Sequence, residues 1–160
     1  MTQQIAALGV LLRIGEGEAE LKAFEDQWSH ERLVMNKWFG LQVAASAPRD
    51  AAATAEALTA HPAFDWKNPN RFRAVFGALS GNAAGFHAPS GAGYRLLADW
   101  LLKLDPLNPQ TTARMTQAFS TWKRYDADRK TLIRAELERI ASTEGLSRDT
   151  SEMIGRMLAD

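Results

Sequence analysis

Residues 68–94 read NPNRFRAVFGALSGNAAGFHAPSGAGY, and this stretch decides the fold class. Asn68 followed by Pro69 is a helix-start signal, because the asparagine side chain can accept a hydrogen bond from a first-turn N–H and proline lacks only a donor that has no partner there. Apolar residues then recur at helical spacing, at Phe72, Val75, Phe76 and Leu79. The pattern predicts a helix that stops at residues 80–82, a connection rich in small residues, and a second helix near Tyr94.

The same periodicity runs through the rest of the chain, and no stretch alternates for long enough to predict a strand. We expect nine helices. Pro48 is expected to open an alanine-rich fourth helix. Asn108-Pro109 is expected to open the seventh, whose apolar stripe continues to Trp122. Asp126 and Ser147 are expected to cap the eighth and ninth.

The two Asn-Pro starts lie 40 residues apart, at positions 68 and 108. This spacing is typical of the roughly 40–47-residue repeats of the HEAT and armadillo type. The sequence therefore predicts an all-α fold of stacked antiparallel helices that form a HEAT/armadillo-like superhelix, with residues 1–160 as a single helical-repeat domain. In such a stack the two Asn-Pro helices run parallel, so that their N-terminal ends share one rim.

Composition excludes several classes of function. Nineteen basic residues balance nineteen acidic ones, so the chain has no overall attraction to nucleic acid or to an anionic membrane. Cysteine is absent, and no apolar run approaches the ~18 residues of a membrane span. The apolar N-terminus has no basic region before it and is a poor signal peptide. We therefore expect neither a nucleic acid nor a membrane as a partner.

The motifs that would carry catalysis are incomplete. His-Glu at residues 30–31 begins a helical zinc motif, but Val34 stands where the second histidine is needed. The glycines of residues 91–93 begin a dinucleotide fingerprint, but Leu96 stands where the third is needed. Neither serine near the glycine-rich connection lies in a G-x-S-x-G elbow. Residues 122–125 (WKRY) mix basic and aromatic side chains, for which core packing and helix-end charge are the favoured interpretation. The sequence predicts no catalytic residue and no metal site.

Two arginines are the sharper candidates for binding. Arg73 and Arg114 each lie within two turns of an Asn-Pro start, where helices prefer negative charge. Two guanidinium groups on one rim would suit a carboxylate. The alternative is that each arginine pairs with a local acid such as Asp65 or Asp99.

Six blocks, in order, resemble the C-terminal domain of bacterial aminopeptidase N (alanyl aminopeptidase), a family of gluzincin zinc metallopeptidases. The blocks are FEDQW (24–28), LVMNKWF (33–39), NPNRFR (68–73), FHAPSGAGY (86–94), LNPQ (107–110) and KRYD (123–126). The resemblance runs from about Phe24 to the C-terminus. It implies a long, multidomain, cytoplasmic hydrolase that removes N-terminal residues from peptides.

In that family an H-E-x-x-H motif with a downstream glutamate holds the zinc, a G-x-M-E-N motif holds the substrate amine, and both lie in an earlier domain. Neither pattern occurs in this chain. The resemblance therefore implies a fragment without peptidase activity or a cofactor of its own, with zinc in the catalytic domain of the parent enzyme. Its implied partners are the catalytic and other domains of its own parent chain, and peptide substrates.

The resemblance also implies a role for this domain: it caps the active-site domain and closes an internal chamber. The residues matching Arg73 and Arg114 would face that chamber and attract the C-terminal carboxylate of short peptides. Further residues of the same stretch would line the opening: Arg71, Asn70, Tyr94 and His87. For Asn70 and Tyr94 a structural role is an equal alternative.

Two other functions compete with this one. The chain could be a free-standing helical-repeat scaffold that binds a protein partner, because a solenoid without its neighbour exposes an apolar end. A nucleic-acid-binding function would predict salt-sensitive retention on DNA or RNA, and the neutral charge argues against it. An upstream H-E-x-x-H motif would distinguish the peptidase from the scaffold.

Overall fold

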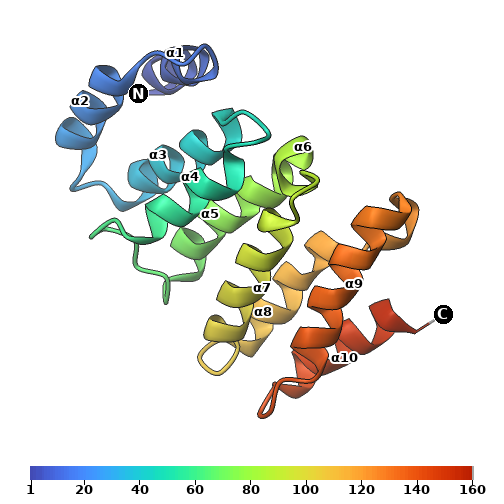
Figure 1. The fold of residues 1–160 in the computed structure, drawn as a ribbon. Helices are drawn as coiled ribbons and strands as arrows, with labels where there is room; N and C mark the ends of the chain where they lie inside the picture. The colour runs from blue at the N-terminus through green and yellow to red at the C-terminus, as the bar shows by residue number, and fades with distance from the viewer. Residues whose placement is uncertain (160) are drawn as a thin grey trace. The chain divides into compact units, whose positions relative to one another are not determined.

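The computed structural model describes residues 1–159, which contain helices and turns but no strand (Figure 1). The α-helices of this described part are α1 (Thr2–Arg13), α2 (Glu18–Trp28), α3 (Arg32–Ala45), α4 (Ala51–Thr59), α5 (Pro69–Gly81), α6 (Ala83–Phe86), α7 (Ala92–Leu104), α8 (Pro109–Met115), α9 (Ala127–Ala141) and α10 (Arg148–Leu158). Two 3-10 helices, η1 (Thr116–Phe119) and η2 (Trp122–Arg124), follow α8. The predicted all-α class is confirmed. Within the same residues, no helix is both long and apolar enough to cross a membrane.

The chain divides into two compact units, Met1–Gly85 and Phe86–Asp160. Each has its own apolar core, described below. That residues 1–160 form one domain of a longer peptidase stays a prediction.

Helix α3 is the centre of the first unit, because α1, α2, α4 and α5 all pack against it. A β-carbon at Gly40 of α3 would lie 2.9 Å from the carbonyl oxygen of Ala74 in α5. Only glycine allows the two backbones to come this close. The core of the unit consists of fully buried side chains from α3, α4 and α5: Phe39, Val43, Ala51, Ala55, Phe72, Val75, Phe76 and Leu79.

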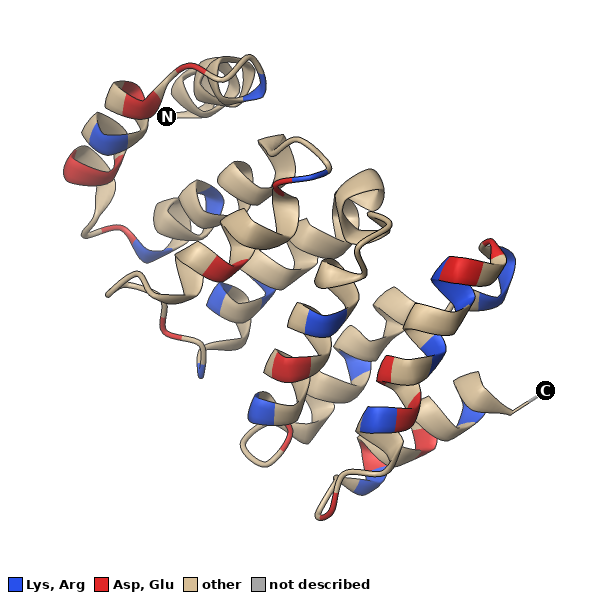
Figure 2. Ribbon diagram, viewed as in Figure 1, with Lys and Arg blue, Asp and Glu red and all other residues tan. Residues whose placement is uncertain are grey.

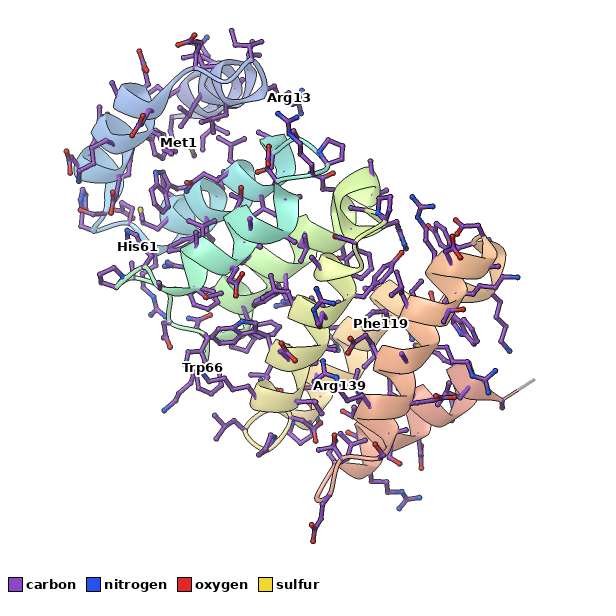
Figure 3. The ribbon with its side chains drawn as sticks, viewed as in Figure 1. Met1, Arg13, His61, Trp66, Phe119 and Arg139 are labelled. Atoms are coloured by element: carbon purple, nitrogen blue, oxygen red, sulfur yellow. The ribbon has the colours of Figure 1, made fainter. Side chains whose placement is uncertain are left out.

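Polar contacts attach α2 and the connection between α4 and α5 to this core. The indole Nε1 of Trp38 donates to the Leu21 carbonyl at 3.0 Å. His61, labelled in Figure 3, has its Nε2 2.9 Å from Oε1 of Glu25, and its Nδ1 accepts from the Ala63 N–H at 3.1 Å. Because Nδ1 is an acceptor, the neutral ring carries its proton on Nε2 and donates it to Glu25. The ring therefore holds α2 to a loop 36 residues away.

In the second unit, α7 packs against α8 and α9, and α10 packs against α8, α9 and η1. The core is again made of buried side chains, namely Tyr94, Leu97, Leu101, Leu104, Phe119, Ile133, Leu137, Ile140 and Ile154. Arg139 of α9, labelled in Figure 3, contacts Asp99 of α7 at 2.7 Å and so links the two helices at the surface.

A buried carboxylate joins the end of α7 to the start of α10. Asp105, which is 3% exposed, accepts the Ser147 N–H at 2.7 Å and the Ser147 hydroxyl at 2.7 Å. It also accepts the hydroxyl of the fully buried Thr150 at 2.5 Å. The three bonds satisfy the charge inside the unit and fix where α10 begins.

The predicted helix starts are confirmed at four positions. The side chains of Asn68, Asn108, Asp126 and Ser147 each accept a backbone N–H of the first turn. The predicted start of the fourth helix at Pro48 is wrong, because α4 begins at Ala51. Pro48 instead lies in a turn closed by the Asp50 N–H and the Ala47 carbonyl at 2.9 Å, where its fixed φ suits the second position.

Two further expectations need correction. The short helix α6 was not predicted, so the described residues hold ten α-helices rather than nine. The seventh helix does not run to Trp122, because α8 ends at Met115 and the chain continues as η1 and η2. Buried threonine hydroxyls compete for the helix carbonyls here: Thr112 donates to the Asn108 carbonyl at 3.0 Å and Thr116 to the Ala113 carbonyl at 2.5 Å. Such bonds to the preceding turn disturb the regular α-helical pattern.

Candidate functional site

The Asn-Pro start of α5 positions the first group of candidate residues. The side-chain oxygen of Asn68 accepts the N–H of Asn70 at 2.9 Å and that of Arg71 at 3.4 Å. This cap fixes the first turn, and the helical rotation then separates the two arginines. Arg71 and Arg73, two residues apart, point about 200° apart around the helix axis.

Arg71 turns into the first unit. It is 8% exposed, and its Nε donates to the side-chain oxygen of Asn36 at 2.6 Å. Its two terminal nitrogens donate to the carbonyls of Ala63 and Arg32, and its guanidinium lies 4.7 Å from the centre of the Phe39 ring. Burial lowers the pKa of Arg71, and the charge of Asp65 opposes that shift. These three hydrogen-bond acceptors are all neutral, and through them Arg71 ties α3 and the loop before α5 to α5 itself.

Arg73 turns outward to solvent. Its Nη2 donates to the side-chain oxygen of Asn70 at 2.8 Å, and its Nε donates to the Pro69 carbonyl at 3.3 Å. Within residues 1–159 it forms no ion pair, and the charge of Asp65 acts on Arg71 instead. Arg73 and Asn70 therefore form an exposed polar pair whose positive charge no carboxylate of the described chain neutralises.

Arg114 is also exposed and lies in the last turn of α8. Because α8 has only seven residues, this position is near the C-terminal end, where a positive charge is favourable. Asp99, the alternative partner, contacts Arg139 at 2.7 Å. In the part of the chain that the structure describes, Arg114 belongs to no ion pair. Arg73 lies in the first unit and Arg114 in the second, so their shared rim stays a prediction.

His87 and Tyr94 meet in the second unit. The tyrosine hydroxyl lies 2.6 Å from Nδ1 of His87, and Tyr94 itself is fully buried. Burial raises the pKa of Tyr94 to about 12, so its hydroxyl keeps the proton and donates it to the ring. Burial, and secondarily the charge of Arg129, lower the pKa of His87 and favour the neutral ring that can accept this bond.

Three residues that the motif analysis did not assign to this cluster complete it. The ring of Tyr125 stacks on His87 with centroids 4.0 Å apart. Arg129 donates from Nε to the His87 carbonyl at 2.6 Å and from Nη1 to Asp126 at 2.7 Å. The KRYD block contains two of them, Tyr125 and Asp126, but a sequence separation of about 40 residues gives no signal that they contact His87. The cluster holds the loop before α7 in place.

The described residues do not fit a zinc ion. Nowhere in residues 1–159 do three or more His, Cys, Asp or Glu side chains come together in a group that could hold a metal. His30 lies 3.8 Å from Glu31, and His61 and His87 are held by their bonds to Glu25 and Tyr94.

A family model described as "Domain of unknown function (DUF3458_C) ARM repeats" matches residues 1–159. The chain belongs to this family. The armadillo-like repeat class predicted from the two Asn-Pro starts is thereby confirmed. The ARM-repeat family model covers both units and every candidate residue named above.

Relatives of this ARM-repeat chain are aminopeptidases. Aminopeptidase N of Caulobacter vibrioides is 41% identical over 99% of the chain, and that of Haemophilus influenzae is 40% identical over 99%. The crystal structure of Legionella pneumophila aminopeptidase A in complex with aspartic acid matches 99% of the chain with a TM-score of 0.92 and 33% identity. The resemblance to the C-terminal domain of aminopeptidase N is confirmed. The chain spans 18% of the length of the two curated relatives and 19% of the Legionella chain.

Proposed function

We propose that this chain is the non-catalytic helical domain of a longer, cytoplasmic zinc aminopeptidase that removes N-terminal residues from peptides. In this proposal the domain caps the active-site chamber and helps to admit and orient the peptide. Zinc, its H-E-x-x-H ligands and the G-x-M-E-N motif belong to another domain of the parent chain. The similarity to aminopeptidases covers 99% of this chain but only 18% of their length, which supports the placement of the catalytic residues in another domain.

The observation that carries the substrate role is the exposed, uncompensated charge of Arg73. Its guanidinium is oriented by Asn70 at 2.8 Å and has no carboxylate partner in the described chain. A guanidinium held in this way is suited to a carboxylate such as the C-terminus of a short peptide. Arg114 would supply a second positive charge from α8. Arg71, by contrast, would act through the packing of α5, and His87 and Tyr94 through the position of the loop before α7.

The test is made in the full-length enzyme with short peptides that end in a free carboxylate or in an amide. Arg73→Ala and Arg114→Ala are each expected to raise KM for the acid by about tenfold, the equivalent of one charge-assisted hydrogen bond of about 1.4 kcal/mol. The amide should respond little. Arg13→Ala, which removes an exposed arginine from the end of α1, is the matched control. Unchanged KM and kcat for both peptides in both variants would exclude the carboxylate role.

The free-standing scaffold is the competing function, and one feature favours it: an apolar groove between α1 and α2, of about 280 Å³. Its apolar lining comes from Ala7, Leu8, Leu11, Ala23 and Phe24. An antibody against the chain, used to blot native cell extract, separates the two functions. A band several times heavier than 17.7 kDa supports the aminopeptidase proposal, and a band at 17.7 kDa alone supports the scaffold.

A further inference from the structure

The second unit has a basic groove that the aminopeptidase proposal does not use. It lies along α9, beside η2 and the end of α10, and measures about 540 Å³. We call it the α9 groove. Its lining residues are Trp122, Lys123, Ala127, Lys130, Thr131, Arg134 and Leu158.

The apolar part of the α9 groove is held firmly. Trp122 is 8% exposed, and its indole Nε1 donates to the Met157 carbonyl at 3.0 Å. That bond fixes η2 against the last turn of α10, which also supplies Leu158 to the lining. Ala127, in the first turn of α9, leaves room between them. One aliphatic side chain of a ligand could be buried here without rearranging the core.

Among the described residues, the polar part of the lining carries three cations and no carboxylate. The ammonium of Lys123 donates to the neutral Ala159 carbonyl at 2.7 Å, and within residues 1–159 it forms no ion pair. Lys130 is exposed and has no ion-pair partner within residues 1–159. Among the described residues, Arg134 is the one lining cation with an ion-pair partner, Glu138 at 2.7 Å. Figure 2 shows basic and acidic positions interspersed along α9, so the excess charge is a property of this groove and not of the whole helix.

We propose that the α9 groove binds an acidic segment of a partner protein, in extended conformation, with an aliphatic residue between its acidic residues. The spacing supports this occupant. Lys130 and Arg134 are four residues apart on one helix and so about 6 Å apart along its axis, which matches the about 6.6 Å between alternate residues of an extended chain. Two acidic residues at alternate positions can then face Lys130 and Arg134, and an aliphatic residue two positions further along can lie against Trp122 and Leu158 in the apolar lining.

A nucleic acid fits the α9 groove less well. Binding of single strands relies on exposed aromatic rings for base stacking, and the ring of Trp122 is almost fully buried with its N–H already bonded. The net charge of the chain is zero, and one of the three lining cations is neutralised by Glu138. Sustained contact with a phosphate backbone needs more positive charge than this.

The test uses the 160-residue chain and the fluorescent peptide Glu-Ser-Glu-Ser-Leu-Ser-Glu-Ser-Glu, whose symmetric pattern makes the direction of binding unimportant. We expect saturable binding, measured by fluorescence anisotropy at low salt, and at least a fivefold loss when glutamine replaces every glutamate or serine replaces the leucine. Lys130→Glu should weaken binding about tenfold, because it exchanges an attraction for a repulsion. Lys37→Glu, an exposed lysine on α3, is the matched control and should change nothing.

Three results would overturn the proposal. The first is a failed binding assay, which means either no binding at peptide concentrations up to about 1 mM or an equal loss of peptide affinity in the Lys37 and Lys130 variants. The second is tighter binding of an oligo-dT strand that displaces the peptide, which would make the groove a nucleic-acid site. The third is a dimer in light scattering that Lys130→Glu dissociates, which would make a second copy of the chain the occupant.

Discussion

Replacing Asp105 by alanine is expected to be among the most destabilising single changes in the second unit. The carboxylate accepts three hydrogen bonds of 2.5–2.7 Å, two from Ser147 and one from Thr150. After truncation the Ser147 hydroxyl can turn to water, whereas the backbone N–H of Ser147 and the fully buried Thr150 hydroxyl lose their acceptor. A buried donor left without a partner costs about 1–3 kcal/mol. The buried Thr150 hydroxyl and the half-buried Ser147 N–H together give an expected loss of about 2–4 kcal/mol in the free energy of unfolding.

Urea unfolding, followed by circular dichroism and tryptophan fluorescence, measures this loss directly. Asp149→Ala is the matched control, because it removes an exposed carboxylate from the first turn of the same helix, α10. Its only expected effect is the loss of a favourable charge near the helix N-terminus, about 0.3–1 kcal/mol. The slope of the free energy against urea should be the same in both variants, since neither changes the surface exposed on unfolding.

Asp105→Asn gives a graded second test. In this variant an amide nitrogen, which donates, replaces one carboxylate oxygen, which accepts. Only the hydroxyls of Ser147 and Thr150 can rotate to accept from that nitrogen. The expected loss in the free energy of unfolding is therefore about half of that for Asp105→Ala. The reasoning is refuted if Asp105→Ala lies within about 0.5 kcal/mol of Asp149→Ala, since that is the range of an ordinary surface substitution.

Three further predictions concern glycine, histidine and arginine positions. Gly93→Ala places a β-carbon 2.7 Å from a backbone oxygen and should lower the free energy of unfolding by about 2 kcal/mol. Gly77→Ala places a β-carbon in open space at a helical position and should raise it by about 0.5–1 kcal/mol. Thermal melting of the two variants measures the difference. Burial and the charge of Arg129 lower the pKa of His87 from 6.5, so the unfolded chain binds this proton more tightly. Stability should therefore decline as the pH falls below 6.5, and His87→Asn should flatten that decline in urea titrations at several pH values. Arg71→Ala should cost about 3 kcal/mol in the same urea assay, because its buried acceptors lose their donor.

The helix starts could be predicted from the sequence because their chemistry is local. Asn68 and Asn108 accept N–H groups no more than three residues ahead, and the same holds for Asp126 and Ser147. A helix cap is therefore determined by the few residues that follow it in the sequence. The end of α8 was not predictable in this way, since the apolar stripe continues through η1 and η2 while the buried hydroxyl of Thr116 bonds back to the preceding turn.

The buried polar contacts lay beyond the reach of pattern analysis. No local pattern in the sequence predicts the bonds of Asp105, because its partners lie 42 and 45 residues further along the chain. The cluster around His87 was unpredictable for the same reason, because Arg129 is 42 residues away in the sequence. Such pairs are set by which helices pack together, and a single sequence does not contain that information at either position.

Arg71 and Arg73 show a signal that was present in the sequence and not used. The resemblance implies that Arg73 faces the internal chamber and that Arg71 lines the same opening. Arg71 precedes the buried Val75 by four residues and therefore lies on its face of α5, whereas Arg73 is two residues from Val75 and turns about 200° away. The apolar stripe that predicted the helix thus also distinguishes the buried Arg71 from the exposed Arg73, which a ligand could reach. A charged motif on a helix should be divided by face before any of its residues is assigned to a site.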